Sequence, residues 1–256
     1  MAVDKTSNKM DNVLRMAYTN LIIFVSDFHL KMLILVTGTS RGIGEALIHH
    51  LATVQRAKVI AVSRKQVPAA KQHKDILYVK ADIATEQGRA LVVKAVKATR
   101  LPLAALVNNA GAMLNKPFGK ITPQQLSDVY TANVATPFLL TQALLPQMVK
   151  GSHIVNIGSM GGVIGTAKFP GLSAYSSSKG ALSVLTECLA EELKPRGIAA
   201  NCLALGAVQT EMLKAAFPGY QAPLTSAEMA AYIADFVCTG HRFYNGKVLP
   251  VSSSTP

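Results

Sequence analysis

The sequence predicts an α/β fold in which a doubly wound parallel sheet of about seven strands forms a single domain. Three observations support this fold class. Short apolar runs recur along the chain, longer helical segments separate them, and a glycine-rich turn follows the first run directly. Runs that are apolar on both faces are typical of parallel strands, because helices cover both faces of such a sheet.

The predicted strands begin after Met32, where the pattern becomes regular. They span residues 33–36, 59–62, 76–79, 103–107, 154–157, 199–205 and 247–251. Helical segments between them indicate crossover connections within one sheet. Residues 32–256 contain no internal repeat or long linker, so we expect them to form the one folded domain. Residues 1–31 have weak periodicity, and we expect them to be a dispensable N-terminal extension.

The composition is that of a compact globular protein with a basic surface. The formal net charge is +12, but the Lys and Arg residues are scattered, without a basic block or an RNA-binding aromatic motif. This charge favours an anionic cofactor or a solvated surface over nucleic acid. No apolar stretch approaches the ~18 residues of a membrane span. The short apolar run at residues 21–25 lacks a cleavage site after it, which predicts a cytosolic protein.

Cysteine and histidine show no metal-binding or disulfide pattern. The three cysteines are Cys188, Cys202 and Cys238; they lie in apolar segments and form no C-x-x-C pair. We expect them to be reduced packing residues. The histidines show no ligand spacing, so no metal site is predicted.

The turn after the first strand has the composition of a dinucleotide-binding loop. Its glycines permit a tight turn and close approach of backbone to a pyrophosphate, which the N–H groups of a helix N-terminus bind. A lone glycine cluster is weak evidence, but the strand before it and the amphipathic segment 45–51 after it meet the required context. The predicted cofactor-binding residues of this loop are Gly38, Ser40, Arg41, Gly42, Ile43 and Gly44.

The end of the second strand indicates which dinucleotide is bound. A carboxylate there would bind the ribose 2′-hydroxyl of NAD, and the chain has none; it has Ser63 and Arg64 instead. Together with Arg41 on the facing loop, these residues offer charge-assisted contacts to a 2′-phosphate. NADP(H) is therefore favoured over NAD(H), although both arginines would also suit a solvated surface.

A proline interrupts the helical segment that contains Asn133. Pro137 has no N–H group, so the carbonyl of Asn133, four residues earlier, loses its partner within the helix. A free carbonyl can hold a water molecule. The alternative is a simple helix kink.

Three further side chains are predicted at the catalytic centre. Ser159 ends the fifth strand at the carboxyl edge of the sheet, where ligands of open α/β sheets bind, and no G-x-S-x-G motif surrounds it. Tyr175 and Lys179 lie four residues apart on one face of a predicted helix. An ammonium group at roughly 5 Å would lower the pKa of the phenol by about two units. This spacing alone is more often found on a helix surface, so the other motifs must decide.

Taken together, these motifs resemble the short-chain dehydrogenase/reductase family, in its standard non-extended form. The T-G-x-x-x-G-I-G loop, the N-N-A-G segment at 108–111 and Tyr175-x-x-x-Lys179 occur in the family's order, and the resemblance runs from Met32 to about Val251. It implies a Rossmann-type fold that binds a nicotinamide dinucleotide. It also implies that Ser159 holds the substrate carbonyl and that Asn133 anchors a water in a proton relay.

The resemblance implies further cofactor contacts. Asp82, with Ile83 beside it, would reach the adenine; Asn109, Ala110 and Gly111 would form the floor beneath the adenosine ribose. After the sixth strand, Gly206, Val208 and Thr210 would bind the nicotinamide carboxamide, although the proline that relatives have in this turn is replaced. Tyr175 and Lys179 would also contact the cofactor.

The predicted function is reversible NADP-dependent oxidoreduction of a carbonyl compound and its alcohol, with Asn133, Ser159, Tyr175 and Lys179 as the catalytic residues. A small-molecule substrate is the expected partner, and relatives imply a homodimer or homotetramer. The alternative is a non-catalytic dinucleotide sensor of the same fold, which would not need the complete set of catalytic residues. Substrate choice depends on residues 112–120, 160–172 and 207–224. We expect little room for a lid after Glu211, and hence an open substrate pocket or one completed by a partner subunit.

Overall fold

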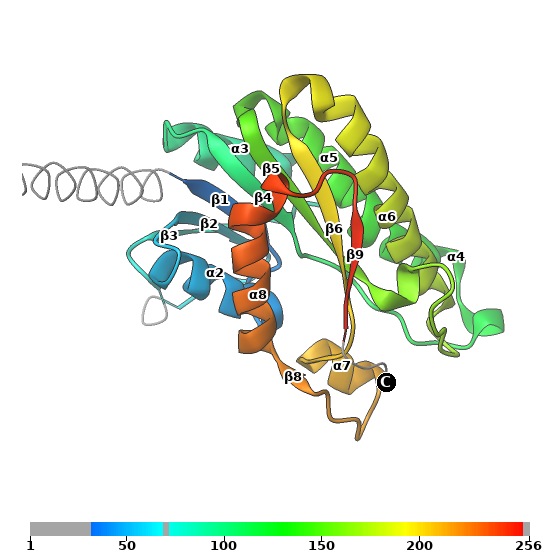
Figure 1. Ribbon diagram of the computed structural model, residues 1–256. Coiled ribbons are helices and arrows are strands. Elements are labelled where there is room, and N and C mark those ends of the chain that lie inside the picture. Colours follow the sequence, from blue (N-terminus) through cyan, green and yellow to red (C-terminus); the bar gives the residue numbers. More distant parts are fainter. Residues whose placement is uncertain (1–31, 69–71, 253–256) are drawn as a thin grey trace, which may run out of the picture.

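The computed structural model describes residues 32–68 and 72–252. The expected extension over residues 1–31 lies outside this part of the chain. The described residues form one parallel sheet covered by helices on both faces (Figure 1).

The seven strands of the large sheet are all parallel, in the order β3-β2-β1-β4-β5-β6-β9. Their bounds are β1 Leu33–Thr37, β2 Lys58–Ser63, β3 Ile76–Lys80, β4 Leu103–Asn108, β5 Met148–Ser159, β6 Ala199–Leu205 and β9 Val248–Val251. The doubly wound sheet predicted from the sequence is confirmed. The strand order reverses between β1 and β4, and this switch point is where open α/β sheets bind ligands.

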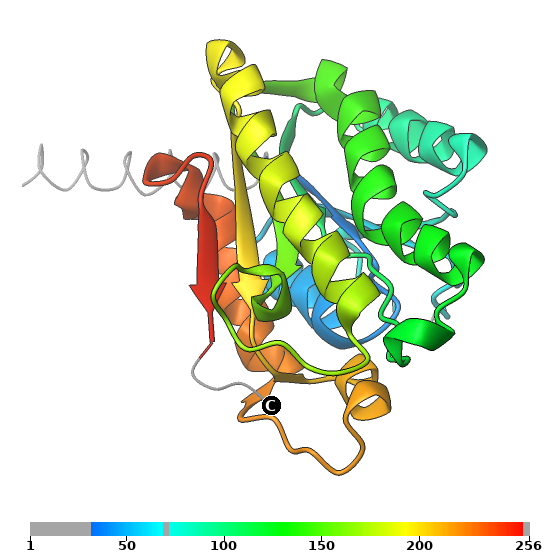
Figure 2. The same ribbon diagram turned by 90° about the vertical axis from the view of Figure 1, so that its right-hand side faces the viewer.

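The two faces of the sheet are covered by different helices (Figures 1 and 2). The helices are α2 Gly42–Thr53, α3 Glu86–Ala98, α4 Pro123–Tyr130, α5 Thr136–Leu144, α6 Ser173–Leu193, α7 Glu211–Ala216 and α8 Ser226–Thr239. Shorter turns are η2 Phe118–Lys120, the π-helical η3 Thr131–Ala135, η4 Leu145–Gln147, η5 Met160–Gly162, η6 Lys194–Arg196 and η7 Gly240–Arg242. Helices α2 and α8 lie on one face, and α3, α5 and α6 lie on the other.

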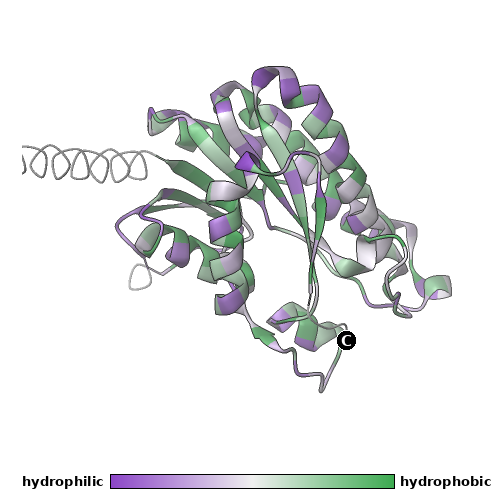
Figure 3. Cartoon of the chain, viewed as in Figure 1, coloured by the Kyte–Doolittle hydropathy of each residue, from purple (hydrophilic) through white to green (hydrophobic). Residues whose placement is uncertain are grey.

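The core has two layers, because the side chains of each strand point alternately to the two faces of the sheet. In β1, Ile34 and Val36 pack in the cluster beneath α2 and α8, whereas Leu33 and Leu35 pack in the cluster beneath α3, α5 and α6. Successive side chains of a strand point to opposite faces, so one apolar run serves both layers. Figure 3 shows the result, with hydrophobic strands at the centre and hydrophilic residues on the outer helix faces.

The connection from β2 to β3 differs from the prediction. We expected a helix between every pair of strands, but the described residues between Ser63 and Ile76 contain none. Pro68 in this connection has no N–H group for a helix interior, and the segment is short. The edge of the sheet at β3 is therefore less covered than its centre, and Leu77 remains 47% exposed.

The segment after β6 forms a small unit of its own. β7 (Val208–Gln209) pairs in parallel with β8 (Leu224–Thr225), and α7 lies in the loop between them. Within the described residues, no helix has the length and apolar character required to cross a membrane. The same residues contain no cluster of three or more His, Cys, Asp or Glu side chains suited to a metal ion.

Candidate active site

The predicted catalytic residues lie together at the carboxyl edge of the sheet. Ser159 is the last residue of β5, and Tyr175 and Lys179 lie in the first turns of α6. Asn133 lies in the π-helical turn between α4 and α5. Tyr175 is 8% exposed, Lys179 5% and Asn133 0%, so the three side chains are buried together.

Tyr175 and Ser159 are joined by a side-chain hydrogen bond. The Ser159 hydroxyl also accepts a hydrogen bond from the Gly161 N–H at 3.3 Å. Burial raises the pKa of Tyr175 above its ordinary value, and the hydrogen bond to Ser159 only partly opposes this effect. The expected lowering of the Tyr175 pKa is therefore wrong for this structure, and the phenol is held protonated at neutral pH.

The position of Lys179 explains the difference. Its Nζ lies 6.0 Å from the centre of the Tyr175 ring and donates a hydrogen bond to the carbonyl of Ile157 at 2.7 Å. The amine is thus directed at the backbone of β5. Burial lowers the pKa of Lys179 to about 8. The lysine is positioned beside the tyrosine, but the effect of burial on the phenol is the larger one.

Asn133 connects the loop after β4 to α6 through its side chain. Its Oδ1 accepts from the Ala112 N–H at 2.8 Å, and its Nδ2 donates to the Ala112 carbonyl at 2.8 Å and to Ser178 Oγ at 2.9 Å. Ser178 in turn donates to the carbonyl of Tyr175. The sequence analysis missed Ser178, and its only signal was its place between Tyr175 and Lys179.

The helical segment that contains Asn133 is interrupted by a π turn. The Thr136 N–H donates to the carbonyl of Thr131, five residues back, which makes a π turn directly before Pro137. Proline cannot continue the regular hydrogen-bond pattern, so the helix changes its pitch at this point. The turn brings Asn133 Oδ1 beneath Gly111, where an added Cβ would lie 2.9 Å from that oxygen and 3.4 Å from Lys179 Nζ.

The glycine loop interlocks with the loop after β4. Gly38 and Gly42 have φ angles of 72° and 59°, which glycine adopts without strain. Asn109 Nδ2 donates to the carbonyls of Thr37 and Gly38 at 2.9 and 3.2 Å. A Cβ at Gly44 would lie 2.5 Å from the same nitrogen. The predicted residues of both loops are therefore adjacent, with Ile43 partly buried against the core and Ala110 beside Gly38.

The residues predicted to read the 2′-phosphate are not all brought together. The Ser63 hydroxyl donates to the carbonyl of Lys65 at 2.7 Å, and Arg64 is exposed. A hollow of about 110 Å³ between the glycine loop and the segment after β2 has Ser40 and Lys65 in its wall. Arg41 forms an ion pair with Glu211 of α7 instead.

Asp82 and Ile83 follow β3. Ile83 is buried, whereas Asp82 is exposed and its Oδ1 accepts a hydrogen bond from the Ala84 N–H at 3.1 Å. The Asp82 carbonyl accepts from the side chain of Thr85, the residue that caps α3. This turn leaves the Asp82 carboxylate accessible at the same edge of the sheet.

The segment predicted to hold the carboxamide lies beside the glycine loop. Gly206 donates through its N–H to the carbonyl of Val251 at 2.9 Å, which ties the end of β6 to β9. Val208 is buried in β7. The Thr210 hydroxyl accepts from the Leu213 N–H at 3.1 Å and caps α7, so its own proton is available to a carbonyl acceptor.

The segment after Glu211 contacts the two loops on which substrate choice is expected to depend. Helix α7 is short, but both substrate loops contact its far end. Asn115 Nδ2 donates to the carbonyl of Ala216 at 2.7 Å, and the rings of Phe169 and Phe217 meet edge to face at 5.5 Å. These contacts join α7 to both loops, while the expectation of little room for a lid stays a prediction.

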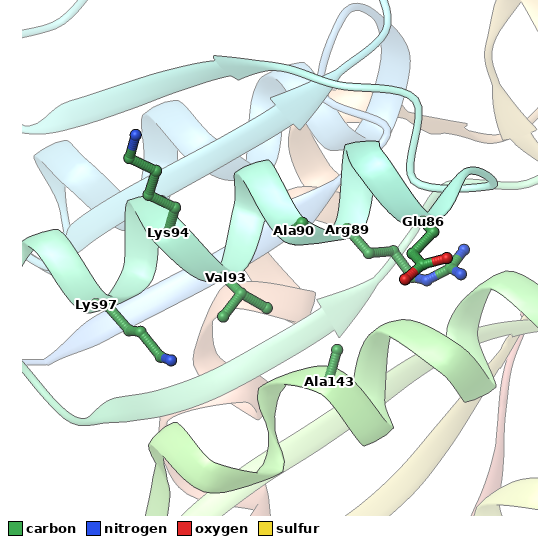
Figure 4. Close-up of a pocket in the computed structure, with 7 residues that line it drawn as sticks. All are labelled: Glu86, Arg89, Ala90, Val93, Lys94, Lys97 and Ala143. Carbon is green, nitrogen blue, oxygen red and sulfur yellow. The ribbon is translucent and has the colours of Figure 1, made fainter.

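A second hollow lies away from the predicted site residues. It has a volume of about 500 Å³ and lies between α3 and α5, with Val93 of one helix facing Ala143 of the other (Figure 4). Arg89 and Glu86 approach each other at one end, and Lys94 points away. None of the predicted site residues lines this hollow, so we do not assign the chemistry to it.

A parallel sheet with a glycine-rich first turn, together with Ser, Tyr and Lys at its carboxyl edge, defines the class of dinucleotide-dependent oxidoreductases. The chain belongs to the short chain dehydrogenase family, whose model matches residues 32–221. It is accordingly an NAD(P)-dependent enzyme of the type that interconverts C=O and CH–OH groups.

Curated relatives cover most of the chain. A 3-oxoacyl-[acyl-carrier-protein] reductase of Vibrio cholerae is 31% identical over 188 residues, which are 71% of this chain and 75% of the relative. A mouse dehydrogenase/reductase, SDR family member 4, is 32% identical over 256 residues, with 87% of this chain and 86% of the relative covered.

Solved structures match the fold as well. A short chain dehydrogenase from Burkholderia cenocepacia in complex with NADP has a TM-score of 0.75 and 28% identity, and covers 88% of this chain and 97% of its own. A 3-ketoacyl-(acyl-carrier-protein) reductase from Brucella melitensis in complex with NADH has a TM-score of 0.75 and 26% identity, with 86% and 96% covered. Among these relatives, both cofactors therefore occur.

Proposed function

We propose that this chain is an NADPH-dependent carbonyl reductase. The hydrogen-bonded pair of Ser159 and Tyr175 beside the buried Lys179 is the observation that carries the proposal. A sensor that only binds dinucleotide could use Lys179 to hold the ribose, but it would not need Ser159 paired with Tyr175 beside that lysine. The non-catalytic alternative therefore receives no support.

The residues present fit a nicotinamide dinucleotide. At Gly111 a side chain would fill the space beside Asn133 and Lys179, and at Gly38 a Cβ would lie 2.7 Å from the Ala110 backbone. These glycines let the two loops pack closely at the carboxyl edge, where a dinucleotide is expected to lie. Gly42 begins α2, whose N-terminal N–H groups suit a pyrophosphate. When bound, the nicotinamide supplies the hydride.

Tyr175 is the proposed general acid. Its raised pKa keeps the proton on the phenol at neutral pH, as reduction of a carbonyl requires. The Ser159 hydroxyl hydrogen-bonds the substrate oxygen and stabilises the negative charge that develops there. Lys179, still protonated at neutral pH, holds the nicotinamide ribose and stabilises the phenolate left after proton transfer.

Asn133 is proposed to support the return of the proton to Tyr175. Both N–H groups of its side chain are used by Ala112 and Ser178, and the backbone carbonyl of Asn133, four residues before Pro137, is the proposed group for a relay water. Ser178 links Asn133 to the backbone carbonyl of Tyr175 and so helps to fix the position of Tyr175 in the first turn of α6.

The preference for NADP(H) rests on charge. Arg64 and Lys65 follow β2, no acidic residue lies at this strand end, and Arg41 lies on the loop opposite. We further propose a cytosolic homo-oligomer whose catalytic domain comprises residues 32–256, with a small carbonyl compound as substrate.

The test follows NADPH absorbance over a panel of aldehydes and ketones. We expect Tyr175→Phe to bind NADPH nearly as the wild type does but to lose activity by at least about 10³-fold, because no general acid remains. Near-normal turnover by this variant with an identified substrate would exclude the proposed mechanism. Failure of the wild type to reduce any member of the panel while still binding NADPH tightly would favour the sensor.

A further inference from the structure

An ion pair between the glycine loop and α7 has no part in the roles assigned so far. Arg41 Nη1 donates to Glu211 Oε2, and the two side chains remain 60% and 66% exposed. The residues are 170 positions apart in the sequence, so the fold brings them together. The same Arg41 guanidinium is the group that we expect to bind a 2′-phosphate.

The backbone holds Glu211 close to the glycine loop. Thr210, the residue before it, is extended and caps α7 through Leu213. The side chain of Thr210 faces Gly42, where an added Cβ would lie 3.6 Å from Thr210 Cγ2. Because Glu211 follows directly, its carboxylate lies within reach of the Arg41 side chain.

We propose that Glu211 determines how strongly the enzyme distinguishes NADP(H) from NAD(H), by competing with the 2′-phosphate for the Arg41 guanidinium. This inference rests on the proposed function, in which Arg41 reads the phosphate. The carboxylate already holds Nη1 of Arg41, so a phosphate competes with it for that donor and for the positive charge of the guanidinium. NAD(H) has no 2′-phosphate and leaves the pair intact, so Glu211 affects one cofactor and not the other.

The size of the effect follows from the exposure of the pair. An ion pair between exposed side chains is weak, and releasing it corresponds to a change of about 1.5- to 5-fold in a dissociation constant. The phosphate contact itself is charge-assisted and stronger. Screening by salt reduces both, and the effect of Glu211 should disappear near 1 M salt, where the Debye length is about 3 Å.

The test measures dissociation constants of NADPH and NADH for the full chain at low salt, from the fluorescence of the bound cofactor. We expect Glu211→Gln to bind NADPH about 1.5- to 5-fold more tightly and NADH unchanged. Glu192→Gln is the matched control, since this exposed residue of α6 forms no ion pair within the described residues. It removes the same charge and should change neither constant.

A double variant shows whether Glu211 acts through Arg41. Arg41→Gln should weaken NADPH binding by about tenfold, and Glu211→Gln should have no effect in its background. The proposal is overturned if Glu211→Gln changes both cofactors equally, changes neither, or keeps its effect without Arg41. If Arg41→Gln weakens NADPH alone while Glu211→Gln does nothing, the NADP preference stands and only the competition fails. If neither Arg41→Gln nor Arg64→Gln alters the ratio of the two constants, the proposed preference itself is wrong.

Discussion

At the scale of single residues, the buried Lys179 is the clearest case of function opposing stability. Its amine has one hydrogen bond, to the Ile157 carbonyl, and burial lowers its pKa to about 8. The unfolded chain, with the ordinary lysine pKa of about 10.5, holds this proton more tightly. Between pH 8 and 10.5 the unfolded state binds more protons than the folded state. The contribution of Lys179 to the free energy of unfolding therefore rises with pH in this range and is lowest below pH 8.

We therefore predict that Lys179→Met makes the protein more stable and inactive. Removing the buried charge should raise the free energy of unfolding at pH 7 by about 1–3 kcal/mol, after allowing for the Ile157 carbonyl left unpaired. Denaturant unfolding checks this, and the gain should shrink as the pH approaches 10.5. A variant that is less stable at pH 7 would contradict the prediction.

His153 is a second buried group whose protonation affects stability. Its Nδ1 contacts the Val237 carbonyl at 3.1 Å, and its Nε2 contacts Asn201 Nδ2 at 3.0 Å. That amide also donates to the Tyr244 carbonyl, while its Oδ1 accepts from the Lys247 N–H, which fixes its orientation. The ring is therefore neutral, with its proton on Nδ1, and burial lowers the pKa of His153 to about 4.

We predict that His153 makes the fold sensitive to mild acid. The unfolded histidine protonates near pH 6.5 and the folded one near pH 4, so stability falls by up to about 3 kcal/mol as the pH drops through this range. Unfolding curves from pH 7 to 4 should show this loss in the wild type and in the control His50→Gln, on the partly exposed side of α2. Over the same pH range, the free energy of unfolding of His153→Gln should fall by about 3 kcal/mol less than that of the wild type. Equal losses in the wild type and both variants would show that His153 does not cause the acid sensitivity.

At the scale of elements, the π turn connects the loop after β4 to helix α6. Asn133 is fully buried and satisfies both backbone groups of Ala112 as well as Ser178. A regular helix would rotate this side chain away, because the extra residue of a π turn shifts all the residues after it. The geometry of Tyr175 thus depends on an irregularity in η3, which precedes both α5 and β5 in the chain.

Asn133→Ala should accordingly harm both stability and catalysis. The substitution leaves three polar groups without their partner, and we expect a loss of about 2–4 kcal/mol in the free energy of unfolding. At a temperature where the variant is folded, kcat should fall more than the KM for NADPH rises. Gln124→Ala, which removes an exposed amide bonded only to Asp128 on α4, is the control and should change neither value appreciably.

Local signals predicted most elements but not the contacts between distant ones. The glycine loop and Ser159 could be predicted because each lies at a strand end with a fixed place in a parallel sheet, and Tyr175 because of its spacing to Lys179 on one helix face. The helix-free connection from β2 to β3 and the Arg41–Glu211 pair could not, since neither has a periodicity or motif. The Tyr175 pKa was predicted wrongly, because spacing reports a nearby charge but not the depth of burial.

At the scale of the whole molecule, the described elements account for a complete doubly wound sheet. Strand β1 lies between β2 and β4, and its residues are at most 1% exposed. Helices within the described part cover both faces, with α2 and α8 on one side and α3, α5 and α6 on the other. We therefore expect this core to form without residues 1–31.

We predict that a chain beginning at Met32 folds and binds NADPH as the full chain does. Its midpoint of thermal unfolding should lie within about 2 °C of the full-length value, because the difference in stability should stay below about 1 kcal/mol. The dissociation constant for NADPH should be unchanged, since every predicted cofactor contact follows Met32. A chain beginning at Gly38 is the control: it lacks β1, which leaves β2 and β4 without their shared partner, and it should not fold. If the chain beginning at Met32 also fails to fold, the domain starts earlier than proposed, and residues 1–31 belong to it.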